Sequence, residues 1–155
     1  MEFPKRKNLR LKNFDYSTGG YYFITICTHN RQELFGEIVG ATLCGRPGEM
    51  IEKWLFKLQN KFNDVEITDY VIMPDHIHFI ISKTGDHTGS PLRDMVGWFK
   101  TMTTNEYIRN VKNNEFQPFS KKIWQRGYYE HIIRDEQDYL TKARYIQNNI
   151  YKKTL

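Results

Sequence analysis

The order of apolar and polar positions divides the chain into seven regular elements. Four segments are dense in β-branched and aromatic residues and predict strands, at 21–28, 65–73, 76–83 and 127–134. Three segments carry apolar residues at intervals of three and four, which predicts amphipathic helices at 48–62, from 91 to about 111, and from 136 to 150. Their order is that of a ferredoxin-like split βαβ unit with one more helix. We therefore expect an α+β fold, with one antiparallel sheet, helices packed on one face and an extra C-terminal helix.

Several short signals mark where these elements begin and turn. Ser90 is placed to cap the second helix with Pro91 at its first position, and Asp135 is placed to cap the third. The Pro-Asp pair at 74–75 predicts a turn, because proline cannot donate a hydrogen bond into a central ladder. Residues 65–83 should therefore form a hairpin. An irregular hairpin is expected at 35–44.

Length and composition restrict the class of protein. The chain has 155 residues, which is the size of one domain. It begins without the apolar run of a signal peptide, and its longest apolar stretch is too short to cross a bilayer. Its two cysteines cannot form a disulfide framework or a four-cysteine zinc site. We expect a single cytoplasmic domain over residues 1–155 with no membrane partner.

The charge balance favours a polyanionic partner. Lys and Arg number 23 against 18 Asp and Glu, which gives a net charge of +5 with the histidines neutral. Residues 1–20 are polar and basic, and predict either a loosely ordered arm or an arm that follows a phosphate backbone. The basic side chains that would make these contacts are Lys5, Arg6, Lys7, Arg10 and Lys12.

A second basic segment, 124–134, interleaves aromatic and basic side chains. This composition suits stacking on unpaired bases with phosphate contacts nearby. Arg126 and Arg134 are its candidates for phosphate contacts. For Tyr129 and Ile133 we instead expect packing against helices.

Two histidines stand at the start of the third predicted strand. Side chains alternate along a strand, so His76 and His78 share one face and lie about 6.6–6.8 Å apart along it. Two neutral imidazoles suit Mn²⁺, Zn²⁺ or Fe²⁺, and a site that adds oxygen ligands and water can use Mg²⁺. The alternative is a half-buried pair whose nitrogens are satisfied by hydrogen bonds.

The last predicted helix carries a polar stripe beside its apolar one. Tyr145 and Asn149 on this stripe present a phenol and an amide one turn apart. A phenol is a nucleophile once its proton is removed or its oxyanion is stabilised, and an amide oxygen can bind a hard cation. A packed or surface ring is the alternative for Tyr145, because spacing alone does not bring this helix to the histidines.

Four segments in this order resemble the HUH single-tyrosine transposases, and more narrowly the insertion-sequence-200-like domain and the REP-associated tyrosine transposases. They are YYFITICTHNRQELFG at 21–36, VIMPDHIHFII at 71–81, WFKTMTTNEY at 98–107 and WQRGYYEHIIRDEQDYLTKARYIQNN at 124–149. The resemblance covers nearly the whole chain. It implies a nucleoid-associated enzyme that uses Mg²⁺ or Mn²⁺ to cleave and rejoin single-stranded DNA beside hairpins or palindromes.

The same resemblance implies roles for individual residues. His76 and His78 match the HUH metal ligands, Tyr145 matches the nucleophile that forms a 5′-phosphotyrosine link, and Asn149 matches the third ligand. The basic arm would then lie at the foot of the DNA hairpin. Relatives include monomers and homodimers that exchange the tyrosine helix, and the sequence does not choose between them.

This chain departs from the family pattern in two places. Asp75 stands where the family commonly has asparagine, and its carboxylate either strengthens metal binding or caps the turn. Asn149 is followed by Ile150 where the family often has proline, so the helix should continue to about Lys153. From the residues themselves two other functions stay open. One is a non-catalytic, ferredoxin-like module that binds single-stranded nucleic acid, and the other is a metallohydrolase that does not use Tyr145.

Overall fold

A computed structural model describes residues 20–36, 47–83 and 91–154, and in them four strands form one antiparallel sheet. The strands are β1 (Gly20–Cys27), β2 (Val65–Met73), β3 (His76–Lys83) and β4 (Tyr129–Ile133). Their order across the sheet is β2-β3-β1-β4, which is the split βαβ arrangement predicted from the sequence. The α+β, ferredoxin-like prediction is confirmed.

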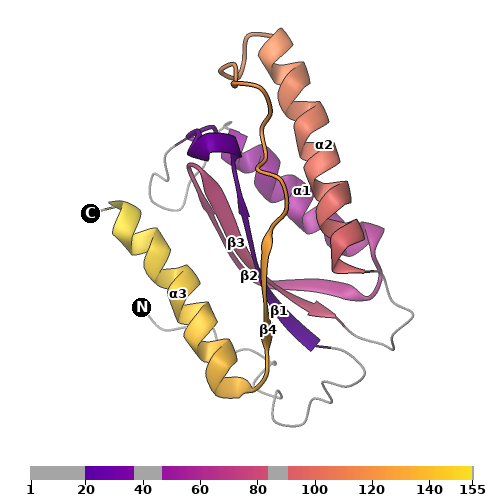
Figure 1. Ribbon diagram of the computed structural model, residues 1–155, viewed down its shortest axis with the longest axis vertical. Helices are drawn as coiled ribbons and strands as arrows, with labels where there is room; N and C mark the ends of the chain where they lie inside the picture. Colours follow the sequence, from indigo (N-terminus) through magenta and orange to yellow (C-terminus); the bar gives the residue numbers. More distant parts are fainter. Residues whose placement is uncertain (1–19, 37–46, 84–90, 155) are drawn as a thin grey trace.

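Three α-helices cover the two faces of this sheet. They are α1 (Pro47–Lys61), α2 (Leu92–Lys112) and α3 (Glu136–Thr154), and a short 3₁₀ turn, η2 (His29–Arg31), follows β1. Helices α1 and α2 lie together on one face, whereas α3 lies on the other (Figure 1). The extra C-terminal helix therefore occupies the face that the first two helices leave open.

The face under α1 and α2 holds the larger hydrophobic core. Ile77 and Phe79 of β3 are fully buried there beside apolar residues of both helices, Leu55 and Phe99 among them. Apolar side chains recur at helical intervals on α1 and α2, so each helix turns one continuous stripe to the sheet. The indole Nε1 of Trp124 donates a hydrogen bond to Thr103 Oγ1 over 2.9 Å inside this core.

The opposite face of the sheet packs against α3 through a smaller cluster. Tyr139, Ala143 and Ile146 of α3 are buried against the sheet, as their spacing predicted. The Asp138 backbone N–H donates to Asp135 Oδ1 over 2.8 Å, which confirms Asp135 as the cap of this helix. The helix extends to Thr154, one residue beyond the expected end.

Two local expectations were wrong. Pro91 has an extended conformation (ψ 145°) and precedes the helix, which begins at Leu92. Tyr129 is 55% exposed and does not pack on a helix, because α3 lies mainly over β2 and β3 and leaves the Tyr129 end of the edge strand β4 open. Ile133 is fully buried, as predicted. Cap residue Ser90 lies outside the described residues.

The arm at 1–20 and the irregular hairpin at 35–44 lie almost entirely outside the residues that the structure describes. Within the described ranges, none of the helices combines the length and the apolar character that crossing a bilayer requires.

Candidate active site

The two histidines are neighbours on the face that α3 covers. Their ring centroids are 4.7 Å apart, and the rings meet edge to face. His78 is 5% exposed, and its Nδ1 lies 2.8 Å from the hydroxyl of Thr25, its partner across β1. The other ring nitrogen of His78, Nε2, is buried without a hydrogen-bond partner. A buried polar atom of this kind is uncommon in folded proteins, and its lone pair is available to a metal ion or a water.

His78 is held as a neutral imidazole. Burial, followed by the nearby charges of His76 and Arg31, lowers its pKa to about 3. The ring of Phe23 stacks on it with centroids 5.4 Å apart and supplies part of this apolar environment. A neutral imidazole keeps a lone pair on one nitrogen, which is the form that binds a metal ion.

Asp75 links His76 to an arginine that sequence analysis did not single out. Its Oδ1 is 2.6 Å from His76 Nδ1, and its Oδ2 accepts a hydrogen bond from Arg31 Nε over 3.0 Å. An ionised carboxylate only accepts hydrogen bonds, so this contact favours a proton on His76 Nδ1 and leaves the lone pair of the ring on Nε2; Arg31 Nη2 also lies 3.3 Å from Nδ1. Partial burial raises the pKa of Asp75, but the hydrogen bonds from His76 and Arg31 outweigh it and lower the pKa overall.

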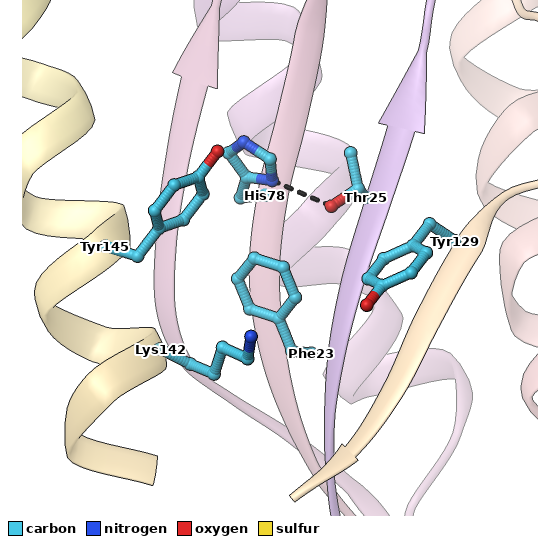
Figure 2. A pocket seen from close by; sticks show the side chains of 6 residues that line it. All are labelled: Phe23, Thr25, His78, Tyr129, Lys142 and Tyr145. Carbon is cyan, nitrogen blue, oxygen red and sulfur yellow. Dashed lines mark hydrogen bonds between the residues drawn. The ribbon is translucent and has the colours of Figure 1, made fainter. Parts of the chain in front are cut away.

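Tyr145 lies beside this histidine pair within the same chain. Its ring centroid is 5.1 Å from that of His78 and 6.0 Å from that of Phe23, and the side chain is 46% exposed. The hydroxyl end of the ring points toward His78 (Figure 2). The buried stripe of α3 sets the rotation of the helix about its axis, and this rotation turns Tyr145 toward the sheet.

Asn149 follows Tyr145 by one turn on α3. Its side-chain Nδ2 donates to the Tyr145 carbonyl oxygen over 2.8 Å, a contact that does not use the amide oxygen. In the described ranges, three or more His, Cys, Asp or Glu side chains nowhere gather in a group suited to an ion. Further ligands beside the two imidazoles would therefore be amide, hydroxyl, phosphate or water oxygens.

A cavity of about 330 Å³ adjoins Tyr145 and His78. The side chains that line it come from three strands and from α3 (Figure 2): Phe23, Thr25, His78, Tyr129, Lys142 and Tyr145. Phe23, Thr25 and Lys142 were not predicted to belong to a site. Side-chain alternation along β1 shows that Phe23 and Thr25 share one face of the sheet. The register between β1 and β3, which the sequence does not give, is needed to place that face beside His78.

The remaining predicted residues lie apart from this cavity or beyond the described ranges. Arg126 and Arg134 are exposed and flank the two ends of β4. A further histidine on β4, His131, has its Nε2 2.9 Å from Asp138 Oδ2, and this contact joins β4 to α3. The candidates of the basic arm, Lys5 to Lys12, lie outside the described residues.

Comparison with known proteins identifies the family. The family model described as "Transposase IS200 like" matches residues 16–149, most of the chain. The chain belongs to the IS200-like transposase family. It is 26% identical to the REP-associated tyrosine transposase of Escherichia coli K12, over 88% of this chain and 70% of that protein. A Haemophilus influenzae protein described as uncharacterized is 35% identical, over 93% of this chain and 87% of its own length.

A solved structure shares the fold of this IS200-like transposase. The REP-associated tyrosine transposase bound to a REP hairpin superposes with a TM-score of 0.63 at 22% identity, over 98% of this chain and 74% of that chain. Transposases of this family process DNA and typically use a divalent metal. The histidine pair fits such an ion, because His78 Nε2 is buried without a partner and Asp75 leaves His76 Nε2 free to bind.

Proposed function

We propose that this IS200-like transposase cleaves and rejoins single-stranded DNA with Tyr145 as its nucleophile and a divalent ion, Mg²⁺ or Mn²⁺, held by His76 and His78. The observation that supports this most is the 5.1 Å separation of the Tyr145 and His78 rings within one chain. The Tyr145 phenol and the His78 imidazole then border one open cavity, and the His76 ring lies next to that of His78. One subunit contains all three groups, so the proposed reaction does not require a second copy.

The reaction assigns a separate task to each side chain. The deprotonated Tyr145 oxygen attacks a backbone phosphorus, the new O–P bond forms as the bond to the 3′ oxygen breaks, and that oxygen takes up a proton. The products are a 5′-phosphotyrosine link and a free 3′-OH. Because the phosphodiester energy is kept in this link, a second 3′-OH can reverse the step and join new strands. His76 and His78 hold the ion, and we assign Asn149 as a third ligand through its amide oxygen.

When bound, the ion supplies positive charge that polarises a non-bridging phosphate oxygen. Tyrosine ordinarily has a pKa near 10, so an unassisted phenol is a poor nucleophile at neutral pH. The Tyr145 ring meets the apolar ring of Phe23 edge to face and lies beside a neutral imidazole, and its side chain is still 46% exposed. The exposed part of the ring can therefore meet a DNA strand without rearrangement of α3.

The proposed DNA partner is a single strand next to a hairpin or palindrome. The solved transposase of the same fold is bound to a REP hairpin, which supports this choice. We assign Arg126 and Arg134, both exposed, to contacts with its phosphates, and Lys5, Arg6, Lys7, Arg10 and Lys12 to the foot of the hairpin. This arrangement spreads the positive charge of the chain along the path of the DNA backbone.

The decisive experiment incubates the protein with hairpin DNA carrying single-stranded arms, in Mn²⁺ or Mg²⁺, followed by denaturing electrophoresis. We expect a protein–DNA adduct that survives denaturation, and its loss in Tyr145→Phe. The matched control is Tyr128→Phe, since this tyrosine precedes β4 and packs toward the opposite core. An adduct that persists in Tyr145→Phe would remove Tyr145 from the mechanism. Cleavage without an adduct would indicate a hydrolase, and binding without cleavage a non-catalytic module.

A further inference from the structure

The cavity beside Tyr145 opens between α3 and the edge strand β4. Its volume of about 330 Å³ lies at the lower end of the range for ligand pockets, which suits one nucleotide better than a folded element. Three of the side chains that line it are aromatic, one is a lysine, and none is acidic. Aromatic rings beside a cation suit the binding of a base and its phosphate.

Tyr129 forms the exposed wall of this cavity. It lies on β4 directly across from Thr25 of β1, on the face that points toward α3 (Figure 2). The side chain is 55% exposed although Ile133, on the same face of the same strand, is fully buried. A large ring held at the rim of a pocket and open to solvent is a stacking platform for an unpaired base.

Lys142 supplies the positive charge of the cavity. It lies three residues before Tyr145 on α3, so the two side chains are neighbours on one helix face. Its Nζ lies 5.3 Å from the centre of the Phe23 ring, and Figure 2 shows this nitrogen pointing into the cavity. No carboxylate lines the cavity, so the lining would attract a phosphate through this ammonium group without opposing it through an acidic side chain.

We propose that this cavity binds the nucleotide adjoining the phosphate that Tyr145 attacks, with its base stacked on Tyr129 and its phosphate paired with Lys142. The chemistry in this statement rests on the proposed function, but the binding does not require cleavage. The two side chains would hold the strand on either side of the nucleophile. They are positioning residues that set which phosphate of the strand lies next to the Tyr145 hydroxyl.

Affinity is measured first, in the Tyr145→Phe background, where the DNA stays intact. The probe is a fluorescein-labelled DNA hairpin with single-stranded arms of mixed sequence. We expect Tyr129→Ala to weaken binding about 5- to 150-fold, the range for losing one stacked base, and Tyr129→Phe to restore it. Ile132→Ala is the matched control, because Ile132 is 45% exposed and lies on the same strand but faces the other way. Thermal melting confirms that each variant folds.

The phosphate contact is measured by the salt dependence of the same affinity. Removing one phosphate contact to a single strand makes the slope of log affinity against log salt shallower by about 0.7. We expect this change for Lys142→Gln and its reversal for Lys142→Arg. Lys61→Gln is the control, since Lys61 is an exposed lysine on α1, beyond the opposite face of the sheet. If Lys142 only packs on Phe23, the slope will not change, and the proposal fails.

Photo-crosslinking locates the base directly. Arms that carry iododeoxyuridine should cross-link to Tyr129, as mapped by mass spectrometry, and cross-links confined to other residues would overturn the proposal. The outcomes also separate this inference from the proposed function. Variants at Tyr129 and Lys142 that bind normally while the wild-type chain forms its adduct would overturn the pocket alone. Weakened binding and a Tyr129 cross-link without any adduct would support the pocket and overturn the nucleophile.

Discussion

The two faces of the sheet are made by alternate residues of the same strands, but they are packed in different ways. Under α1 and α2, Ile77 and Phe79 of β3 are buried in a continuous apolar cluster. Under α3, the intervening residue His78 is equally buried but has a nitrogen without a partner, and an open cavity adjoins it. The first face holds the larger part of the apolar burial that stabilises the fold, and the second combines a smaller apolar cluster with the polar groups suited to chemistry.

This difference follows from how each helix layer covers the sheet. Two helices lie over the first face, whereas α3 alone covers the second and lies mainly over β2 and β3. The second face therefore stays open beside β4, where Tyr129 is exposed and Tyr145 borders the cavity. A stable core on one face lets the other carry buried polar groups that cost stability. Substitutions on the face under α1 and α2 should therefore change mainly stability, and substitutions on the face under α3 should change mainly metal binding and DNA cleavage.

Removing one histidine should give the largest difference between the effect on metal binding and the effect on stability. In His76→Ala we expect no detectable Mn²⁺ binding in electron paramagnetic resonance titrations and no covalent DNA adduct, since one imidazole alone is a weak ligand set. DNA binding and thermal stability should be largely retained, because the His76 side chain is only partly buried. His131→Gln is the control, because that histidine instead contacts Asp138. A collapse of folding in His76→Ala would mean that the pair is structural.

The opposite result, lost stability with metal binding retained, is expected for a residue of β3 that faces α1 and α2. Phe79 is 1% exposed and packs within the core under α1 and α2, next to Phe99. Phe79→Ala should lower the free energy of unfolding by about 3–5 kcal/mol, as measured by urea denaturation, because it leaves a cavity in a closed core. Mn²⁺ binding per folded molecule should not change. A loss below about 1 kcal/mol would show that this face is less tightly packed than we infer.

The sequence predicted the parts of this arrangement that depend on local periodicity. Alternation along β3 placed both histidines on one face, and the spacing on α3 placed Tyr145 beside a buried stripe. The contacts between these parts depend on tertiary structure. Helix α3 is joined to β2 by a hydrogen bond from the Tyr139 hydroxyl to the Asp69 carboxylate, and no local pattern encodes a bond between residues so far apart.

The same dependence on tertiary structure explains why two features near the site were not predicted, the exposure of Tyr129 and the contact between Arg31 and Asp75. Tyr129 was expected to pack because it lies in an aromatic segment, but its exposure depends on which strands α3 crosses. Arg31 reaches Asp75 from η2, where Asn30 and Arg31 both have left-handed backbone conformations, with φ 54° and 55°. Asparagine adopts this conformation more readily than most residues, but arginine does not favour it, so the residue types did not predict two such positions in succession. The role of Asp75, which was left open, becomes testable through this contact.

A smaller effect on the open face should come from Asp75. Its carboxylate orients His76 through Nδ1, so Asp75→Asn should weaken Mn²⁺ binding by about ten-fold, the lower end of the range for a residue that orients a metal ligand. Isothermal titration measures this affinity. Asp94→Asn is the control, because Asp94 is exposed at the start of α2. An unchanged affinity would mean that Asp75 only shapes the turn.

The smallest effect on stability is expected from removing the charge of Glu106, which lies on the side of the sheet covered by α1 and α2. Glu106 of α2 accepts hydrogen bonds from Lys53 Nζ and Trp54 Nε1 of α1, over 2.6 and 2.8 Å. Partial burial raises its pKa, but these two donors outweigh burial and lower it overall. Glu106 therefore contributes stability that is present above its unfolded pKa, near 4.3, and is lost as the pH falls through the lower folded pKa.

Glu106→Gln should consequently be less stable than the wild type at neutral pH by at most about 1 kcal/mol, because Lys53 is partly exposed and the ion pair is screened. Urea denaturation at several pH values should show this difference shrinking as the pH falls below about 4, where the wild-type carboxylate becomes protonated. Mn²⁺ binding should be the same in both proteins. A stability difference that stays constant down to pH 3 would assign the effect to the shape of the side chain, and a change in Mn²⁺ binding would show that the two faces are coupled.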